Sequence, residues 1–216
     1  MKIAAVADIH YPRFFPHFEE SLRTIENPDL FLLAGDIVNR GKSDGYSIVV
    51  DAIDSIFGDI PIIACFGNED YDMFHNENQI IELVGRRVTF LDNEKILLPL
   101  GDSKVGIVGV SIVSERVKEI PAIRSLFEEQ ARRISQSLEE LASDASDLII
   151  LSHYSPLAEN ESSFSWWFHE AIKDHTPSLI IHGHIHDAIE NKIVVESTPI
   201  YNVALPTIGS ITEITL

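Results

Sequence analysis

Short apolar runs recur along the chain, each nearly free of polar residues until its last positions. They lie at residues 2–8, 29–35, 60–67, 104–110, 147–153 and 178–183. Runs of this length and composition are typical of strands that are buried on both faces. They predict a central sheet that is covered by helices.

Amphipathic segments separate these runs, at residues 17–26, 45–57 and 122–143. Their apolar side chains recur at helical spacing, and charged side chains occupy the other face. In the last segment the predicted buried stripe consists of Leu126, Ile134, Leu138 and Leu141. Strands that alternate with helices indicate an α/β fold.

The pattern changes after His186. Residues 192–197, 199–205 and 210–216 read as strands that are separated by turns, with no helical segment between them. This part is predicted to form an antiparallel or mixed sheet. No internal repeat or linker interrupts the chain, and its 216 residues favour a single domain over residues 1–216.

Charge narrows the range of partners. Hydrophobic residues make up 45% of the chain and charged residues 23%, but the formal net charge is −18. So acidic a molecule repels phosphate backbones, which disfavours a nucleic-acid partner and nuclease activity on the sequence alone.

The cysteine content and the N-terminal residues indicate the cellular location of the protein. The single Cys65 lies within an apolar run, so no internal disulfide can form and a core position is expected. Asp8 interrupts the first apolar run early, and no cleavage-site pattern follows. No apolar stretch approaches the roughly 20 residues of a membrane helix. We therefore expect a cytoplasmic protein without membrane contact.

Polar side chains close five of the predicted strands. They are Asp8, His10, Asp36, Asn68, His153, His184 and His186. In open α/β sheets, ligands bind outside the carboxyl ends of the strands. Asp, Asn and His together suit divalent metals of intermediate softness. Seven donors are too many for one metal but sufficient for two, if one carboxylate bridges them.

Each of these residues also has a simpler explanation. Asp8, Asp36 and Asn68 are of the types that cap helices, and each precedes a segment that could be helical. An isolated histidine such as His153 is usually a core residue. The metal hypothesis depends on the whole set.

In chain order the motifs are D-x-H, G-D-x-x-x-R-G, G-N-x-D, S-H-Y and G-H-x-H, from Asp8 to His186. This series resembles the calcineurin-like metallophosphoesterase superfamily. The resemblance implies a four-layer α/β/β/α sandwich with two mixed sheets, in which the C-terminal strands belong to the second sheet. It also implies that the chain is a metal-dependent phosphoesterase.

The resemblance assigns roles residue by residue. Asp8, His10 and His186 would hold the first metal, whereas Asn68, His153 and His184 would hold the second. Asp36 would bridge the two metals, and a hydroxide between them would attack phosphorus. Arg40 would contact the substrate phosphate, although a plain surface arginine is an equal alternative. The glycines of these motifs would allow tight turns beside the metals; they are Gly35, Gly41, Gly67 and Gly183.

The chain departs from the family at two positions. Glu69 occupies the place of a histidine that contacts phosphate and helps to protonate the leaving group. An ionised carboxylate would repel a phosphate dianion, which favours diesters over monoesters. The sequence leaves open whether Glu69 can donate a proton. Asn39 replaces an aspartate and is expected to weaken a supporting contact.

Other histidines and an aromatic segment remain. His182 is expected to be a core residue or to support a ligand, and four histidines are expected at the surface: His17, His75, His169 and His175. Of these, His75 is the best placed to reach the site. The segment 159–170 contains Trp166 and Trp167, and a helical core face is its default interpretation. A substrate lip or a homodimer contact is the alternative.

The function predicted from the sequence is a dinuclear-metal phosphohydrolase that favours phosphodiesters. Phosphomonoester hydrolysis and a non-catalytic scaffold of the same fold are the alternatives. Asp36, Asn68, Glu69, Arg40 and His153 are the residues expected to take part in catalysis. Mn²⁺ is the preferred metal, with Fe, Zn, Ni and Co open. The expected substrate is a small phosphorylated or phosphodiester compound.

Overall fold

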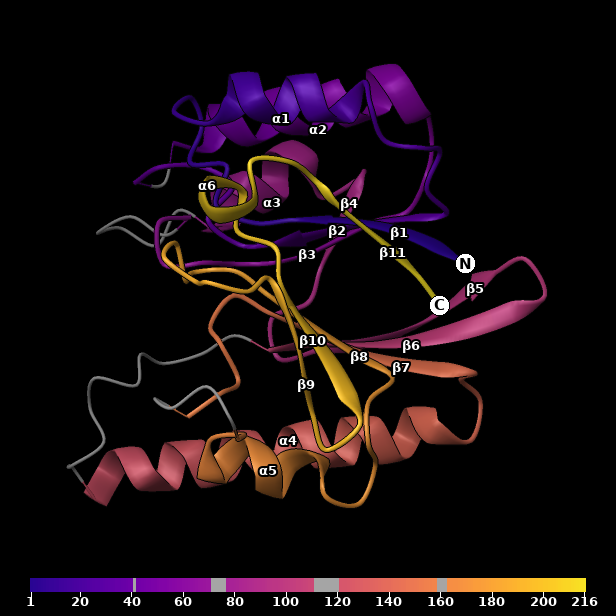
Figure 1. The fold of residues 1–216 in the computed structure, drawn as a ribbon, viewed down its shortest axis with the longest axis vertical. Helices are drawn as coiled ribbons and strands as arrows, with labels where there is room; N and C mark the ends of the chain where they lie inside the picture. Colours follow the sequence, from indigo (N-terminus) through magenta and orange to yellow (C-terminus); the bar gives the residue numbers. More distant parts are fainter. Residues whose placement is uncertain (41, 71–76, 111–120, 159–162) are drawn as a thin grey trace.

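The computed structural model describes residues 1–40, 42–70, 77–110, 121–158 and 163–216. Two sheets pack face to face, and helices cover the outer face of each (Figure 1). The layers therefore run helix, sheet, sheet, helix, which confirms the predicted sandwich. Among the described residues, none of the helices has the length and apolar character that a bilayer crossing requires.

The first sheet has the strand order β11-β1-β2-β3-β4. Its strands are β1 (Lys2–Val6), β2 (Leu30–Ala34), β3 (Ile62–Cys65), β4 (Val88–Phe90) and β11 (Thr212–Thr215). The pairs β1–β2, β2–β3 and β3–β4 are parallel, and β11 is antiparallel to β1. The carboxyl ends of β1, β2 and β3 therefore lie at one edge.

The second sheet has the order β5-β6-β7-β8-β10-β9. Its strands are β5 (Lys95–Leu100), β6 (Ser103–Val110), β7 (Asp147–Ser152), β8 (Leu179–His182), β9 (Lys192–Val195) and β10 (Thr198–Asn202). The central pairs are parallel, and the edge strands β5 and β9 are antiparallel to their neighbours.

Helices form the two outer layers. Figure 1 shows α1 (Phe15–Leu22), α2 (Ser43–Phe57) and α3 (Glu77–Val84) over the first sheet, and α4 (Pro121–Ala142) and α5 (Trp166–Ile172) over the second. A short helix, α6 (Leu205–Ile208), connects β10 to β11.

The strands divide their side chains between these layers because successive residues point to opposite faces. In β1, Ala4 and Val6 pack towards α1 and α2, whereas Ile3 and Ala5 pack between the sheets. In β7, Ile150 joins the core beneath α4 and α5. Every central strand thus has two apolar faces, which explains its nearly unbroken apolar sequence.

Three details differ from the sequence-based predictions. The strand pattern predicted one central sheet, whereas the structure has two. The sequence pattern of an apolar strand is the same whether its second face packs against a helix or against another sheet. The C-terminal strands also separate, because β9 and β10 complete the second sheet while β11 joins the first. The short elements α3, β4 and β5 were not predicted, and α6 lies between the last two strands, where no helix was expected.

The predicted stripe on α4 was wrong at one position. Leu126 is 53% exposed, whereas Phe127 and Ala131 are buried in line with Ile134 and Leu138. Leu126 and Phe127 are adjacent apolar residues, so helical spacing alone left the buried face ambiguous at this end. The cluster of buried residues under α4 decides the face in favour of Phe127.

Candidate metal centre

Loops that follow five strands converge at one edge of the sandwich. Those after β1, β2 and β3 come from the first sheet, and those after β7 and β8 come from the second. They form two groups of donors: Asp8, His10 and His186 in the first group, and Asp36, His153 and His184 in the second. Within each group, one ligand atom per residue lies within 4.8 Å of the others.

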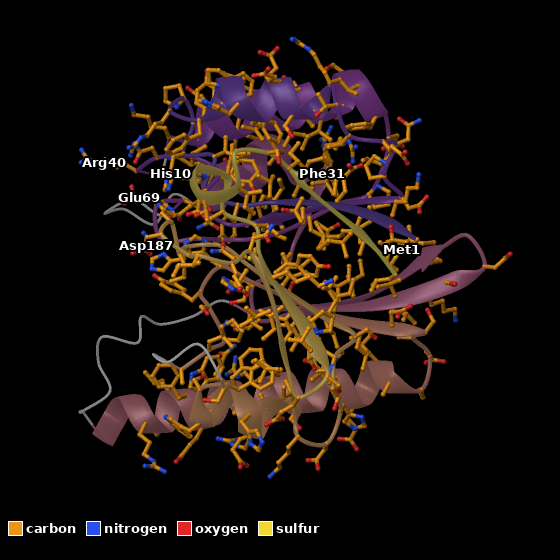
Figure 2. All side chains as sticks on the ribbon, viewed as in Figure 1. Met1, His10, Phe31, Arg40, Glu69 and Asp187 are labelled. Atoms are coloured by element: carbon orange, nitrogen blue, oxygen red, sulfur yellow. The ribbon has the colours of Figure 1, made fainter. Side chains whose placement is uncertain are left out.

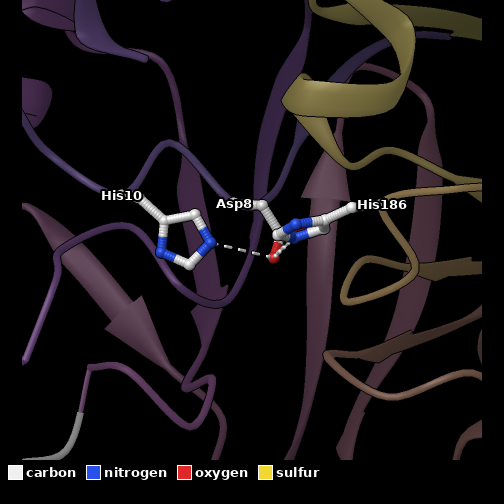
Figure 3. A group of neighbouring side chains, drawn as sticks. All are labelled: Asp8, His10 and His186. Atoms are coloured by element: carbon white, nitrogen blue, oxygen red, sulfur yellow. Dashed lines mark hydrogen bonds and ion pairs between the residues drawn. The ribbon is translucent and has the colours of Figure 1, made fainter. Parts of the chain in front are cut away.

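The first group is centred on the buried carboxylate of Asp8. Its Oδ1 atom lies 2.8 Å from Nε2 of His186 and 3.5 Å from Nε2 of His10. Figure 3 shows the two imidazoles meeting the carboxylate from opposite sides. The other oxygen, Oδ2, accepts a hydrogen bond of 2.9 Å from the backbone N–H of His184. The same carboxylate therefore touches both groups.

The second group contains Asp36 and His153, which are buried, and the partly buried His184. Asp36 Oδ2 lies 3.4 Å from Nε2 of His153, and His153 Nε2 lies 3.2 Å from Nδ1 of His184. His153 Nδ1 is 2.9 Å from the carbonyl oxygen of Ala34. A carbonyl can only accept, so Nδ1 carries a proton whether the ring is neutral or charged, and Nε2 faces the group.

Asp36 lies between the two groups. Its Oδ2 atom is 3.9 Å from Nε2 of His10 in the first group, in addition to its 3.4 Å contact with His153 in the second. Its other oxygen, Oδ1, accepts a hydrogen bond of 2.7 Å from the backbone N–H of Glu69. One carboxylate oxygen thus faces imidazoles from both groups.

The carboxylates and imidazoles shift one another's pKa values. Burial alone would raise the pKa of Asp8, but hydrogen bonds from His10 and His186 hold it well below its usual range. Burial would lower the pKa of His153, yet the hydrogen bond and charge of Asp36 raise it to about 9. The metal-free site therefore holds ionised carboxylate beside protonated imidazole.

The pKa values of His186 and His184 shift in opposite directions. The hydrogen bond to Asp8 raises the pKa of His186. Burial, together with the neighbouring charge of His153, lowers the pKa of His184. A divalent cation in either group would compete with these protons for the same nitrogen atoms.

The backbone is strained where it carries these side chains. Four of the donors have positive φ angles: 60° at Asp8, 45° at His10, 52° at Asp36 and 67° at His184. Residues other than glycine avoid this region, and such strain gathers at functional sites. None of these carboxylates caps a helix, because α1 and α2 have Phe14 and Lys42 at their N-caps. The capping explanation is therefore wrong for Asp8 and Asp36.

Glycines allow the loops to approach one another closely. A Cβ atom on Gly67 would lie 2.2 Å from Oδ1 of Asp36, and one on Gly183 would lie 2.5 Å from Oδ2 of Asp8. Both positions exclude any side chain. Gly35 has a φ of +84° and meets the same crowding, whereas Gly41 lies outside the described residues.

Asn68 lies beside the second group. Its side chain is exposed, and its Oδ1 atom accepts a hydrogen bond of 3.3 Å from the hydroxyl group of Tyr154. The ring of Tyr154 in turn packs against His184, with a centroid distance of 4.5 Å. The amide oxygen of Asn68 is therefore linked to the second group through Tyr154.

Glu69 and Arg40 lie at the rim. The carboxylate of Glu69 accepts a hydrogen bond of 3.3 Å from the backbone N–H of Arg40. The side chain of Arg40 is exposed and extends outwards (Figure 2). Its guanidinium group therefore belongs to neither donor group.

Asp70 supports the site, and sequence reasoning gave it no role. Its buried carboxylate accepts hydrogen bonds from three backbone N–H groups, those of Asp36, Val38 and Gly67, at 2.8, 3.0 and 2.8 Å. Burial and the charge of Asp36 raise the pKa of Asp70 to about 7. Asp70 is the aspartate of the G-N-x-D motif, and this motif was the sequence signal that could have identified it.

Of the other histidines that the structure describes, all but one lie where they were expected. His182 is buried, belongs to neither group and donates Nδ1–H to the carbonyl of Gly183 at 2.8 Å; burial lowers its pKa to about 4. His17 and His169 are exposed, but His175 is partly buried. His75 lies outside the described residues.

The aromatic segment divides into an inner and an outer tryptophan. Trp167 is 2% exposed and packs in the core beneath α5, which agrees with the helical core interpretation. Trp166 is 46% exposed, and the guanidinium group of Arg124 lies 5.0 Å from its ring centroid. Residues 159–162 lie outside the described part.

The donor set suits a divalent metal in each group. One carboxylate and two imidazoles converge in each, and the glycines at positions 67 and 183 leave no room for side chains beside the two carboxylates. Nitrogen and oxygen donors without a thiolate favour Mn, Fe, Co, Ni or Zn over softer ions. The residues therefore fit the metals that the sequence predicted.

Comparisons with known proteins agree with this architecture. The chain is 32% identical over 114 residues to phosphodiesterase YaeI of Escherichia coli (strain K12), an alignment that covers 50% of this chain and 42% of that protein. The chain therefore spans less than half the length of this curated relative.

Solved structures share the fold. The crystal structure of TT1561 of Thermus thermophilus matches with a TM-score of 0.67 and 14% identity, over 95% of this chain and 90% of that one. GAP50, the anchor in the inner membrane complex of Plasmodium, matches with a TM-score of 0.62 and 14% identity, over 96% and 72%. The family model described as calcineurin-like phosphoesterase matches residues 1–188. The chain therefore belongs to the calcineurin-like phosphoesterase family.

Proposed function

We propose that this protein is a dinuclear-metal phosphohydrolase that prefers phosphodiesters. The observation that carries the proposal is the position of Asp36, whose Oδ2 atom faces an imidazole from each donor group. Asp8, His10 and His186 would hold one ion. Asn68, His153 and His184 would hold the other, and Asp36 would serve both.

Mn²⁺ is the metal we propose, because it accepts carboxylate and amide oxygens together with imidazoles, and no thiolate selects for a softer ion. Bound metal ions would supply Lewis acidity to the phosphate group and lower the pKa of water towards neutrality. The chain's own part is to hold the donors fixed. Asp70 does so for the Asp36 loop, and the Ala34 carbonyl does so for the His153 ring.

Arg40 and Glu69 would act on the substrate from the rim. Arg40 extends from the loop after β2, and its guanidinium group would meet a phosphate as it enters. Glu69 is the neighbour of Asn68 and would place a negative charge near the same phosphate. This charge repels a monoester dianion more than a diester monoanion. The family's proton-donating histidine is absent here, and the name of the YaeI relative points in the same direction.

The test compares two generic substrates. The protein is stripped of metal, Mn²⁺ is restored, and kcat/KM is measured for bis(p-nitrophenyl) phosphate and p-nitrophenyl phosphate. We expect metal-dependent turnover with the diester preferred, and a loss of about 10²-fold or more in Asp36→Asn. Glu69→His should shift the preference towards the monoester. Glu139→His, at an exposed position on α4, should not.

Two results would contradict this proposal. Equal or better monoester rates in the wild type would refute the role given to Glu69. The absence of metal-dependent turnover with either substrate would instead favour a binding protein of the same fold.

We propose further that residues 1–216 act as one domain, because the donors come from both sheets. A homodimer through the exposed ring of Trp166 is also a proposal, which light scattering of the wild type and Trp166→Ala would test. A cytoplasmic location stays a prediction that cell fractionation would check.

A further inference from the structure

Tyr154 contacts three of the residues proposed to hold the second metal. It follows His153 directly in the chain, and its ring centroid lies 5.2 Å from that of His153. The ring lies 4.5 Å from that of His184, and the hydroxyl group donates to Oδ1 of Asn68 at 3.3 Å. Tyr154 thereby connects the loops after β3, β7 and β8, which belong to different sheets.

The hydroxyl group can hold the Asn68 amide in its observed orientation. An amide presents a carbonyl oxygen at one end and an N–H₂ group at the other, and only the oxygen can bind a cation. The terminal torsion of asparagine is broad, so both orientations are accessible without a partner. The Tyr154 hydroxyl donates to Oδ1 and so stabilises the orientation that the structure shows. It occupies one lone pair of the oxygen and leaves the second for a metal ion.

No other hydrogen bond competes for this task within the described part of the chain. The Asn68 side chain is exposed, and its bond to Tyr154 is the one that it makes there. By contrast, the backbone carbonyl of Ala34 orients the His153 ring. Asn68 thus differs from His153 in that a neighbouring side chain, rather than a backbone carbonyl, orients it.

We propose that Tyr154 is a positioning residue for the second metal, which turns the carbonyl oxygen of Asn68 towards the ion and packs its ring against His184. This inference rests on the proposed function, because it presumes that the second group binds a metal. It adds a residue that acts through Asn68 and His184 rather than on the substrate.

The test measures metal affinity rather than turnover. Mn²⁺ is titrated into metal-free protein by calorimetry, with thermal unfolding to verify that each variant folds. We expect two ions in the wild type, and Tyr154→Phe should weaken the binding of one ion by about 10- to 100-fold. Tyr201→Phe, which lies on β10 outside both groups, should bind both ions as the wild type does.

A second background separates orientation from general structural support. Asn68→Asp offers two equivalent oxygens, so a hydroxyl is no longer needed to choose between them. In this background, Tyr154→Phe should lose only a small part of the affinity that it loses in the wild-type background. An equal loss in both backgrounds would overturn the role of Tyr154 in orienting the amide.

The outcomes also distinguish this inference from the proposed function. Two ions in the wild type with unchanged affinities in Tyr154→Phe would overturn the inference and leave the proposed function intact. A wild-type protein that binds no second ion would overturn the dinuclear proposal, and the inference with it.

Discussion

At the scale of single residues, hydrogen bonds with neighbouring groups hold the donor side chains in position. The Ala34 carbonyl accepts a hydrogen bond from Nδ1 of His153 and so leaves Nε2 facing the donor group, and the backbone N–H of Glu69 donates to the Asp36 carboxylate. Asp70 extends this support to the backbone, because one buried carboxylate satisfies N–H groups from two loops. Supporting partners of this kind affect metal affinity nearly as strongly as the ligands themselves.

Replacement of Asp70 should test this support. Asp70→Ala leaves three buried backbone N–H groups without their acceptor, so we expect it to lower the free energy of unfolding by at least about 3 kcal/mol. Urea denaturation of the metal-free protein would measure the change. Asp59→Ala is the control, because Asp59 is fully exposed and should cost less than about 0.5 kcal/mol. Similar costs for the two variants would contradict the role of Asp70.

The raised pKa of His153 predicts a pH dependence of stability in the metal-free protein. The pKa is about 9 in the folded protein and 6.5 in the reference state, so the folded state binds the proton more tightly. The stabilisation is complete below about pH 6.5 and is lost as the pH rises through about 9. We expect a loss of up to about 3 kcal/mol over this range, measured by urea denaturation.

Substitution of His153 should remove this pH dependence. His153→Asn is expected to flatten the profile between pH 6.5 and 9, whereas His17→Asn, at an exposed position, should retain it. A wild-type protein whose stability rises over this interval would show that the ion pair with Asp36 does not control it.

At the scale of helices and strands, the position of each element depends on which of its faces is buried. The last strand, β11, is apolar enough to be predicted, yet it pairs with β1 rather than with the other C-terminal strands. On α4, two neighbouring apolar residues compete for the buried stripe, and the core beneath the helix accepts Phe127. Periodicity identifies the element but not its partner.

Paired substitutions on α4 should measure this difference. Leu138 is fully buried, so Leu138→Ala should lower the free energy of unfolding by about 2–5 kcal/mol through lost burial and the cavity that remains. Leu126→Ala removes the same atoms from a side chain that is 53% exposed and should cost much less, within about 0.5 kcal/mol. Equal destabilisation of the two variants would contradict the observed orientation of the helix.

At the scale of the whole molecule, the two sheets contact each other in two places. They share the apolar core between them, and their loops share the donor groups, since Asp8 comes from the first sheet and His186 from the second. An ion held by both would link the sheets at their open edge. Metal binding should therefore raise the stability of the whole fold rather than of one loop.

Removal of metal should reveal this link. With Mn²⁺ at about 100 times its dissociation constant, each occupied site stabilises the folded state by about 2.7 kcal/mol. We expect a chelator to lower the Tm of the Mn²⁺-loaded wild type, measured by differential scanning calorimetry. Asp36→Asn should respond less, because it lacks the carboxylate placed between the groups. A chelator that shifts both proteins equally would contradict the proposal.

Much of this organisation could be predicted from the sequence because it depends on local order. Apolar runs that end in Asp8, Asp36 and Asn68 identified the strands and the candidate donors. The ordered motifs then identified the four-layer fold through the family resemblance. The donor groups that the structure brings together contain residues that were all predicted, although their roles at a metal remain proposals.

The tertiary structure alone decided how these parts meet. The assignment of each strand to one sheet or the other, the pairing of β11 with β1, and the contacts of Asp70 and Tyr154 all depend on residues that are distant in the chain. An apolar run has the same sequence whether it faces a helix or a second sheet. A polar side chain at a strand end likewise does not reveal which backbone N–H or amide it will meet. The sequence by itself therefore determined the candidate donors, their strands and, through the family resemblance, their expected grouping, whereas folding determined which neighbouring groups hold them in place.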